Sequence, residues 1–93
     1  VFDDPALDDQ VREQFMLAAY NAGPTRVRQL RAMTAEELGL DPNRWFFNVE
    51  RAAQARIGNE TVRYVTNVNK YWLAYQLGEA ILQEREAQRD AVN

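Results

Sequence analysis

Apolar residues along this chain recur every three or four positions, which is the spacing of one face of an α-helix. The spacing is clear in the segment VREQFMLAAYNA, at Val11, Phe15, Ala18, Ala19 and Ala22. Asp8 and Asp9 precede this segment and suit the positive end of a helix, and Gly23-Pro24 follows it as a strong stop signal. The pattern predicts a first helix over residues 11–22.

A second helix is predicted directly after the first. Pro24 suits the first turn of a helix and opens one over residues 25–33. Thr34, followed three residues later by Glu37, matches a capping box. We expect this box to begin a short turn that Gly39 closes.

Asp41-Pro42 repeats the pattern of a capping residue followed by proline and predicts another helix start, which leads into Trp45 and Phe46. Asn48 is a suitable N-cap for a helix over residues 49–57, and Gly58 ends that segment.

The last helix is the longest. Asn59 is a suitable N-cap for it, and Glu60 adds a favourable negative charge to its first turn. The pattern predicts one buried stripe, apolar except for two amides, at Val62, Val65, Asn69, Trp72, Leu73, Gln76, Leu77 and Ala80. After Leu82 the sequence QEREAQRDAVN is charged and lacks large apolar anchors, so we expect it to fray or project.

The sequence predicts an all-α fold of about four to five helices, the last one long. No window shows the alternation of apolar and polar residues that is typical of a half-buried strand. The 93 residues suit one small domain and contain no internal repeat. We divide them into a folded part, residues 1–82, and a charged tail, residues 83–93.

Composition limits the chemistry that the chain can perform. The absence of Cys and His excludes disulfides, thiol nucleophiles, Cys/His zinc sites and a Ser-His-Asp triad. Acid/base chemistry would need a carboxylate or a tyrosine, and we expect no metal and no cofactor. With 11 Lys+Arg against 14 Asp+Glu, the charge of −3 argues against a dedicated binder of duplex DNA. We also expect no membrane span and no signal peptide within this sequence.

Two short segments stand out from this helical pattern. AAYNAGP, residues 18–24, is typical of a helix end with an aromatic anchor and a glycine cap. IGNETVRYV, residues 57–65, is typical of a helix start in which Glu60 and Tyr64, four residues apart, share one face. A tyrosine placed there can present its hydroxyl at a groove while its ring packs below.

Together with DPNRWFFNVE at 41–50 and NVNKYWLAYQL at 67–77, these segments resemble the soluble-lytic-transglycosylase-type domain of bacterial cell-wall enzymes. The resemblance extends over residues 2–77, and its later blocks are most similar to a membrane-bound branch of that family. It implies a lysozyme-like helical domain, of which this chain would be the C-terminal portion.

The resemblance also implies an activity. Enzymes of this family cleave the β-1,4 bond between N-acetylmuramic acid and N-acetylglucosamine of peptidoglycan without adding water. One Glu acts first as acid and then as base, while a 1,6-anhydro ring closes on the muramic acid. By resemblance, Tyr64 orients that Glu, and the residues that bind the glycan are Tyr20, Asn21, Ala22, Gly23 and Glu60.

The catalytic Glu of the family has no counterpart in this chain. In the family it forms a Glu-Ser motif followed by a Gly-Leu-Met-Gln stretch, whereas this sequence contains no Ser. Glu13 and Glu50 have the character of surface residues, and Glu60 belongs to its own motif, so none is a substitute. We expect this chain alone to have no turnover on peptidoglycan and to need the N-terminal half of the domain as a partner.

Other side chains have both a structural and a binding interpretation. Two aromatic clusters could be platforms for sugar rings, although core or inter-helix packing is the commoner role: Trp45-Phe46-Phe47, and Tyr71, Trp72 and Tyr75. Three arginines could contact peptidoglycan carboxylates, although a solvated face is the commoner role: Arg26, Arg28 and Arg31. We expect the structural role in each case.

Alternatives from other classes of function stay open. The chain could be a non-catalytic helical module that binds a glycan or a protein and forms a homo-oligomer, because a missing half would leave apolar surface exposed. A helix-turn-helix built on AAYNAGPTRVRQLR is disfavoured by the net charge, so no nucleic-acid partner is expected. By resemblance, the ligand is the peptidoglycan strand, and the location is the periplasm or the outer membrane.

Overall fold

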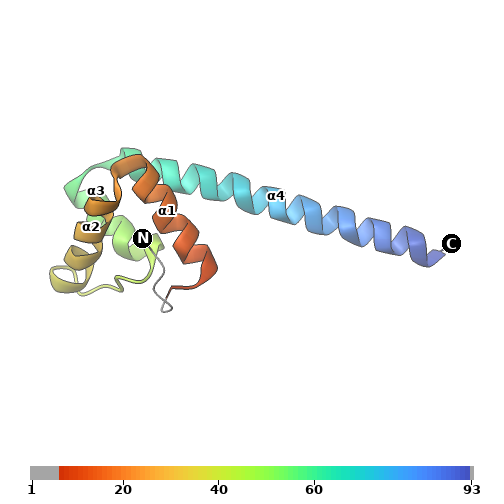
Figure 1. The fold of residues 1–93 in the computed structure, drawn as a ribbon, viewed down its shortest axis with the longest axis horizontal. Coiled ribbons are helices and arrows are strands. Elements are labelled where there is room, and N and C mark those ends of the chain that lie inside the picture. The colour runs from red at the N-terminus through yellow and green to blue at the C-terminus, as the bar shows by residue number, and fades with distance from the viewer. Residues whose placement is uncertain (1–6, 93) are drawn as a thin grey trace.

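The computed structural model describes residues 7–92, which form four helices and no strand (Figure 1). The helices are α1 (Asp9–Ala22), α2 (Pro24–Glu36), α3 (Glu50–Arg56) and α4 (Asn59–Val92). An irregular turn, η1 (Trp45–Val49), precedes α3. The all-α class and the long last helix are therefore confirmed.

Local end signals set the bounds of α1 and α2. The side chain of Asp8 accepts a hydrogen bond from the Val11 amide (2.9 Å) and so caps the first turn of α1. Gly23 ends this helix at φ +96°, a region that favours glycine, and its amide donates to the Ala19 carbonyl. Pro24 then occupies the first turn of α2, as predicted.

The hydrophobic core lies where α1, α2, α3 and the first part of α4 meet. Its largest fully buried apolar side chains are Trp45, Phe15, Leu30, Val27, Val49 and Val65. Phe15 and Trp45 meet edge to face, with ring centroids 6.2 Å apart. Trp45 is a core residue as predicted and Phe46 packs against the same core, but Phe47 is 68% exposed.

The connection between α2 and α3 differs from the predicted one. Asp41-Pro42 does not begin a helix, because the Asp41 carboxylate accepts from the Asn43 amide (2.8 Å) and closes a turn. Asn48 does not cap α3 either. Its side chain accepts from the Asp41 amide (3.0 Å) and donates to the Phe46 carbonyl (2.8 Å), so it holds the connection in place.

Two side chains of α2 also have roles that the sequence did not predict. Thr34 is not a helix cap, since it is buried within α2 and its hydroxyl donates to the Leu30 carbonyl (2.7 Å). Arg31 does not lie on a solvated face. It donates to the Pro42 carbonyl and to the Asn43 side chain, both at 2.9 Å, and so ties α2 to the turn.

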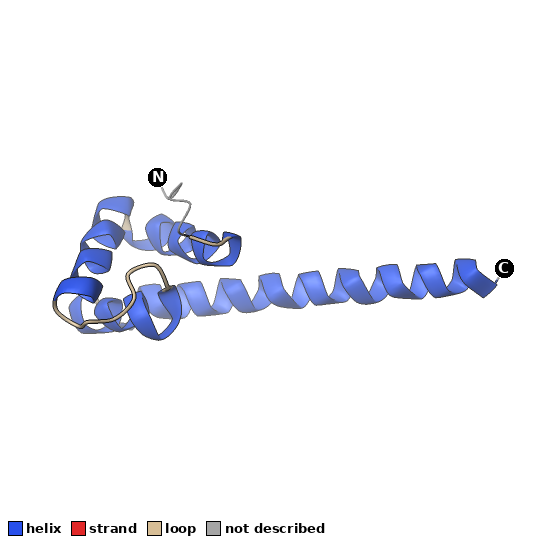
Figure 2. Cartoon of the chain, turned by 90° about the horizontal axis from the view of Figure 1, so that it is seen from below, coloured by secondary structure: helices blue, strands red, loops and turns tan. Residues whose placement is uncertain are grey.

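Helix α4 extends far beyond the other helices (Figures 1 and 2). It has 34 residues against 14 in α1, which correspond to about 51 Å and about 21 Å at a rise of 1.5 Å per residue. Residues 83–92, which we expected to fray, continue α4 as helix. Gln, Glu, Arg and Ala dominate this segment and are good helix formers. The segment does project from the rest of the molecule, which was the other expectation for it. The domain division at residue 82 stays a prediction.

The predicted buried stripe of α4 is correct only at its start. Val62 and Val65 are buried and Asn69 is half-buried. Every later member of the stripe is exposed: Trp72, Leu73, Gln76, Leu77 and Ala80. The expectation that Tyr71, Trp72 and Tyr75 serve core or inter-helix packing was therefore wrong for Tyr71 and Tyr75, which are 75% and 59% exposed, whereas Trp72 lines a hollow between α4 and α1. Within residues 7–92, α4 packs only against α1 and α3, and both lie along its first part.

Candidate functional site

The two segments that stood out in the sequence lie side by side in the structure. The end of α1 carries AAYNAGP, and it lies beside the start of α4, which carries most of IGNETVRYV (Figure 1). The Thr61 hydroxyl donates to the side-chain oxygen of Asn21 at 2.6 Å, across 40 residues of sequence. This bond joins the two helices at the point where the candidate binding residues gather.

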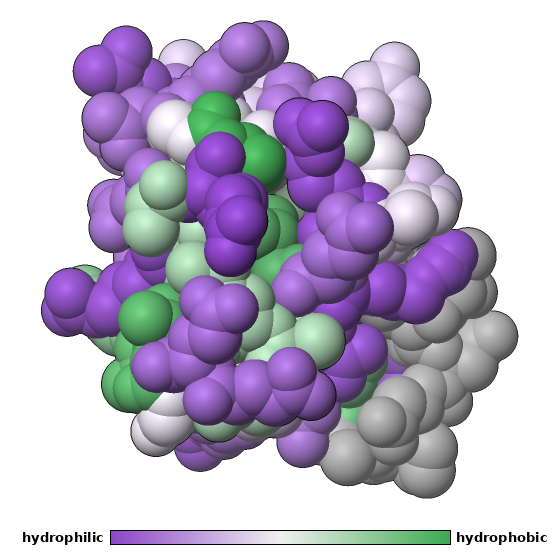
Figure 3. All heavy atoms as spheres, turned by 90° about the vertical axis from the view of Figure 1, so that its left-hand side faces the viewer, coloured by the Kyte–Doolittle hydropathy of each residue, from purple (hydrophilic) through white to green (hydrophobic). Residues whose placement is uncertain are grey.

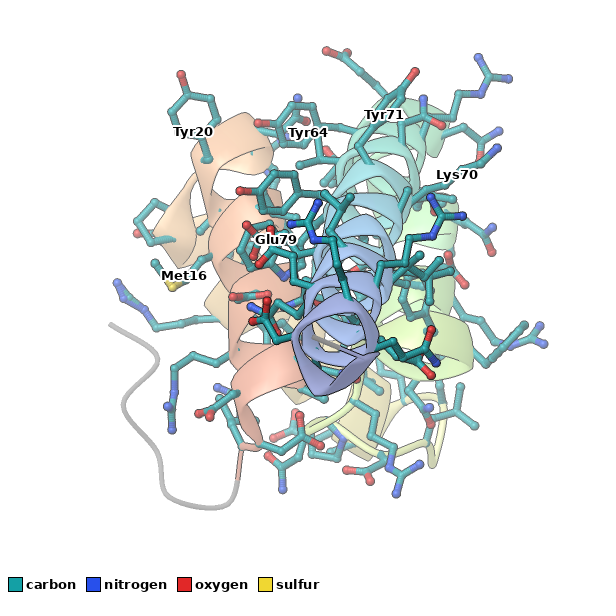
Figure 4. The ribbon with its side chains drawn as sticks, turned by 90° about the vertical axis from the view of Figure 1, so that its right-hand side faces the viewer. Met16, Tyr20, Tyr64, Lys70, Tyr71 and Glu79 are labelled. Atoms are coloured by element: carbon teal, nitrogen blue, oxygen red, sulfur yellow. The ribbon has the colours of Figure 1, made fainter. Side chains whose placement is uncertain are left out.

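Two tyrosines, one exposed and one half-buried, stack on each other at this site. The ring of Tyr20, on α1, stacks on that of Tyr64, on α4, with centroids 6.2 Å apart and planes 19° apart. Figure 4 shows both on the same side of the molecule. Tyr20 is 83% exposed, whereas Tyr64 is half-buried and packs against the core. The structure thus brings together the residue predicted to orient a catalytic Glu and one predicted to bind the glycan.

The remaining predicted site residues surround this pair. Asn21 is exposed, and Ala22 and Gly23 are half-buried at the junction of α1 and α2. Glu60 is exposed in the first turn of α4, one turn before Tyr64. These positions are consistent with one surface shared by all the predicted site residues. The roles of these residues in binding the glycan stay predictions.

An apolar hollow of about 250 Å³ continues this surface along the pair of helices. It lies between α1 and α4, which run antiparallel, and its walls are Glu13, Met16, Leu17, Val68, Asn69 and Trp72. The sequence did not predict this hollow, because helical periodicity assigns each residue to a face of its own helix and does not say which faces meet. Glu13 is an exposed residue at this hollow.

A second hollow, of about 750 Å³, lies between α2 and the end of α3, at the end of the molecule away from the C-terminus. It contains none of the predicted site residues, and its charged lining includes Arg26, Glu36, Glu37 and Arg56. Arg56 and Glu37 are 3.7 Å apart across it. Figure 3 views this end of the molecule, where the surface is mostly hydrophilic with small apolar areas. We do not include it in the candidate site.

The site combines groups that suit a sugar ring. An exposed aromatic face can stack on the apolar face of a pyranose. An amide can donate to and accept from an acetamido group. The oxygen of Asn21 accepts one hydrogen bond from Thr61, so its NH2 group and its second oxygen lone pair remain for a ligand. The hollow beside the tyrosines adds an apolar wall.

No helix within residues 7–92 is both long enough and apolar enough to span a membrane.

Comparison with known proteins identifies relatives of this chain. No family model matches it, and no solved structure matches it. Membrane-bound lytic murein transglycosylase F of Shewanella woodyi is 33% identical over 81 residues, which cover 72% of this chain and 16% of that protein. The protein of the same name from Desulfosudis oleivorans is 36% identical over 78 residues, which cover 70% and 17%. The chain thus spans about a sixth of the length of these relatives. It is a distant homologue of one part of membrane-bound lytic murein transglycosylase F, as the motif resemblance predicted.

Proposed function

We propose that this chain forms one wall of the glycan-binding groove in a peptidoglycan lytic transglycosylase domain of lysozyme-like fold. Distant homology to proteins named lytic murein transglycosylases supports this proposal. The whole domain would be a carbon–oxygen lyase that cleaves the MurNAc–GlcNAc β-1,4 bond and leaves 1,6-anhydroMurNAc. Its location would be the periplasm or the outer membrane, in line with relatives whose names include "membrane-bound".

The observation that carries this proposal is the contact between AAYNAGP and IGNETVRYV. The Thr61–Asn21 hydrogen bond and the Tyr20–Tyr64 stack join two segments that are distant in sequence. Neither contact is needed to close the core, since Tyr20 and Asn21 are exposed. A surface that holds an aromatic ring and an amide in fixed positions is suited to recognising an N-acetylated sugar.

Tyr64 would act as a positioning residue in this groove. Its ring is held between Tyr20 and the core, which restricts where its hydroxyl can lie. A fixed hydroxyl can orient a carboxyl group through a hydrogen bond, and a general acid must be oriented in this way. The Glu itself would come from the N-terminal half of the domain. We therefore propose that this chain alone binds glycan and performs no cleavage.

Titration with a peptidoglycan tetrasaccharide, followed by NMR, tests the binding. We expect the amide shifts to change at residues 19–23 and 60–64. Tyr20→Ala should weaken the affinity about two- to twelvefold, because an aromatic contact contributes about 0.5–1.5 kcal/mol. Phe47→Ala is the matched control, since Phe47 is also exposed but lies in η1. Shift changes elsewhere, or equal losses in both variants, would contradict the proposed groove.

A separate measurement tests the absence of turnover. Purified peptidoglycan is incubated with the chain, and the soluble products are examined by mass spectrometry for 1,6-anhydromuropeptides. We expect none from the chain alone. Their appearance, with loss of the signal in Tyr64→Phe, would mean that a carboxylate of this chain serves as the acid.

A second candidate function is a non-catalytic helical module that binds a glycan or a protein and self-associates. The observation that favours it is the exposure of large apolar side chains on one face of α4, namely Leu73, Leu77 and Ile81. A groove wall and a self-associating surface are compatible, because they would use different faces of α4.

A further inference from the structure

One face of α4 is apolar and has no neighbour in the described part of the chain. Beyond Asn69, Leu73 is 46% exposed, Leu77 63% and Ile81 42%. Figure 4 shows Lys70 on the side of α4 away from α1, whereas Glu79 lies on the side of α1. The face that contains Lys70 is therefore separate from the Tyr20–Tyr64 site.

The residues on this face form a symmetric pattern. Lys70, Leu73, Leu77, Ile81 and Glu84 follow one another at intervals of 3, 4, 4 and 3 residues, so the series is the same in either direction around Leu77. At 3.6 residues per turn, all five lie within about 40° of Leu77 around the helix axis. The apolar positions are central, and the two ends carry opposite charges.

We propose that this face binds a second copy of the chain, with the two α4 helices antiparallel and a two-fold axis at Leu77. Lys70 then lies opposite Glu84 of the partner subunit, and Leu73 opposite Ile81 of the partner subunit. A parallel arrangement would instead place like charges together at both ends of the seam. Antiparallel pairing is thus the one that makes the face complementary to itself, as a two-fold interface requires.

The contact between the two α4 helices is short, and its length limits the strength of the dimer. Lys70 and Glu84 are 14 residues apart, which is about 21 Å along the helix. So short a seam belongs with small interfaces, which form reversible complexes. The neighbouring small residues Ala74 and Ala80 let the helices approach each other closely. This inference does not rest on the proposed glycan groove, which the dimer leaves open on the side of α1.

A charge swap followed by sedimentation velocity over a range of concentrations tests the proposal. Lys70→Glu or Glu84→Lys alone turns both ion pairs of the dimer into repulsive contacts, and we expect each to weaken the dimer about tenfold. The double variant Lys70→Glu/Glu84→Lys exchanges the charges and should restore the wild-type affinity. The matched controls are Arg89→Glu and Glu86→Lys, whose positions lie about 120° and 180° away from Leu77 around the helix.

Cysteine pairing tests the direction of the helices, since the chain has no native Cys. In the antiparallel dimer the two copies of residue 70 are about 21 Å apart, so Lys70→Cys alone should form no disulfide. A mixture of Lys70→Cys and Glu84→Cys chains should form the mixed disulfide. Rapid cross-linking of Lys70→Cys alone would mean parallel pairing and would overturn the proposal.

Substitution at the centre completes the test. Leu77→Glu places two carboxylates together at the two-fold axis, and we expect the variant to be monomeric with unchanged circular dichroism, because Leu77 is 63% exposed in the single chain. A wild-type chain that stays monomeric at every concentration, or a dimer that survives Leu77→Glu, would refute the proposed interface.

Discussion

The first part of α4 carries valines and the part beyond residue 70 carries larger apolar side chains, yet the valines are the buried ones. Val62 is 8% exposed and Val65 fully buried, whereas Tyr75 is 59% and Leu82 58% exposed. Both parts have the apolar content of a packed helix. They differ in that α1 and α3 lie along the first part, whereas in residues 7–92 the second part meets α1 only at the hollow that Trp72 lines. Burial of a helix face therefore depends on the elements that pack against it. A sequence pattern shows only that the face is apolar enough to be buried.

This difference has an energetic consequence. A large apolar side chain that becomes fully buried contributes about 1.5–3 kcal/mol to stability. Trp45 and Phe15 make that contribution in the core, but the exposed side chains beyond residue 70 do not. The stability of the single chain should thus come almost entirely from residues 7–69.

The two tryptophans give the largest test of this comparison. Trp45→Ala removes a fully buried indole, and we expect a loss of about 3–5 kcal/mol in the free energy of unfolding. Trp72→Ala removes one that is 42% exposed, and we expect a loss below about 1 kcal/mol. Urea unfolding followed by circular dichroism measures both. Similar losses in the two variants would mean that the second part of α4 is packed in solution.

Substitutions at the contact between α1 and α4 should have an intermediate effect. Thr61→Val removes the hydroxyl that donates to Asn21 while keeping the side-chain shape. We expect a loss of about 1 kcal/mol, the usual net contribution of one hydrogen bond. A double-mutant cycle with Asn21→Ala isolates the contact, since the two losses should not add. Strictly additive losses would mean that the bond does not hold the two helices together.

The sequence predicted the helices best where their ends depend on local signals. Asp8 and Gly23-Pro24 act through hydrogen bonds and backbone angles within a few residues, so the end of α1 and the start of α2 were predicted correctly. Thr34 and Asn48 were predicted as caps and were wrong. Their side chains bond to the Leu30 carbonyl and across the 41–48 connection instead, and such competing partners are not visible in a local pattern.

The candidate site was predictable in its members and not in its geometry. The motif resemblance singled out Tyr20, Asn21 and Tyr64, and the structure places them on one surface. The partner of Asn21, Thr61, and the hollow that includes Trp72 depend on how α1 lies against α4. That arrangement follows from packing between segments about 40 residues apart, which periodicity within one helix does not specify.

The smallest expected effect comes from Gly78, which lies in the middle of the uncovered part of α4. A Cβ added there meets nothing within 4 Å, so Gly78→Ala changes helix propensity and no contact. Glycine in a helix interior costs about 0.5–1 kcal/mol relative to alanine. No neighbour holds this part of α4 in the single chain, so at concentrations where the chain is monomeric we expect the amides of residues 71–90 to exchange with solvent about two- to fivefold more slowly in the variant.

Thr66→Ala provides the comparison within the covered part of α4. It also raises helix propensity at an exposed position, but there α1 and α3 hold the helix. Opening of residues 59–69 requires those contacts to break, so the exchange of their amides should follow the global stability. The change that Thr66→Ala causes in their exchange rates should therefore be smaller than the change that Gly78→Ala causes at residues 71–90. If Gly78→Ala left exchange at residues 71–90 unchanged, that part of α4 would be held by packing that the single chain does not contain. A second copy seated on the Leu77 face would provide such packing, and the effect of Gly78→Ala should then reappear in the monomeric Leu77→Glu background.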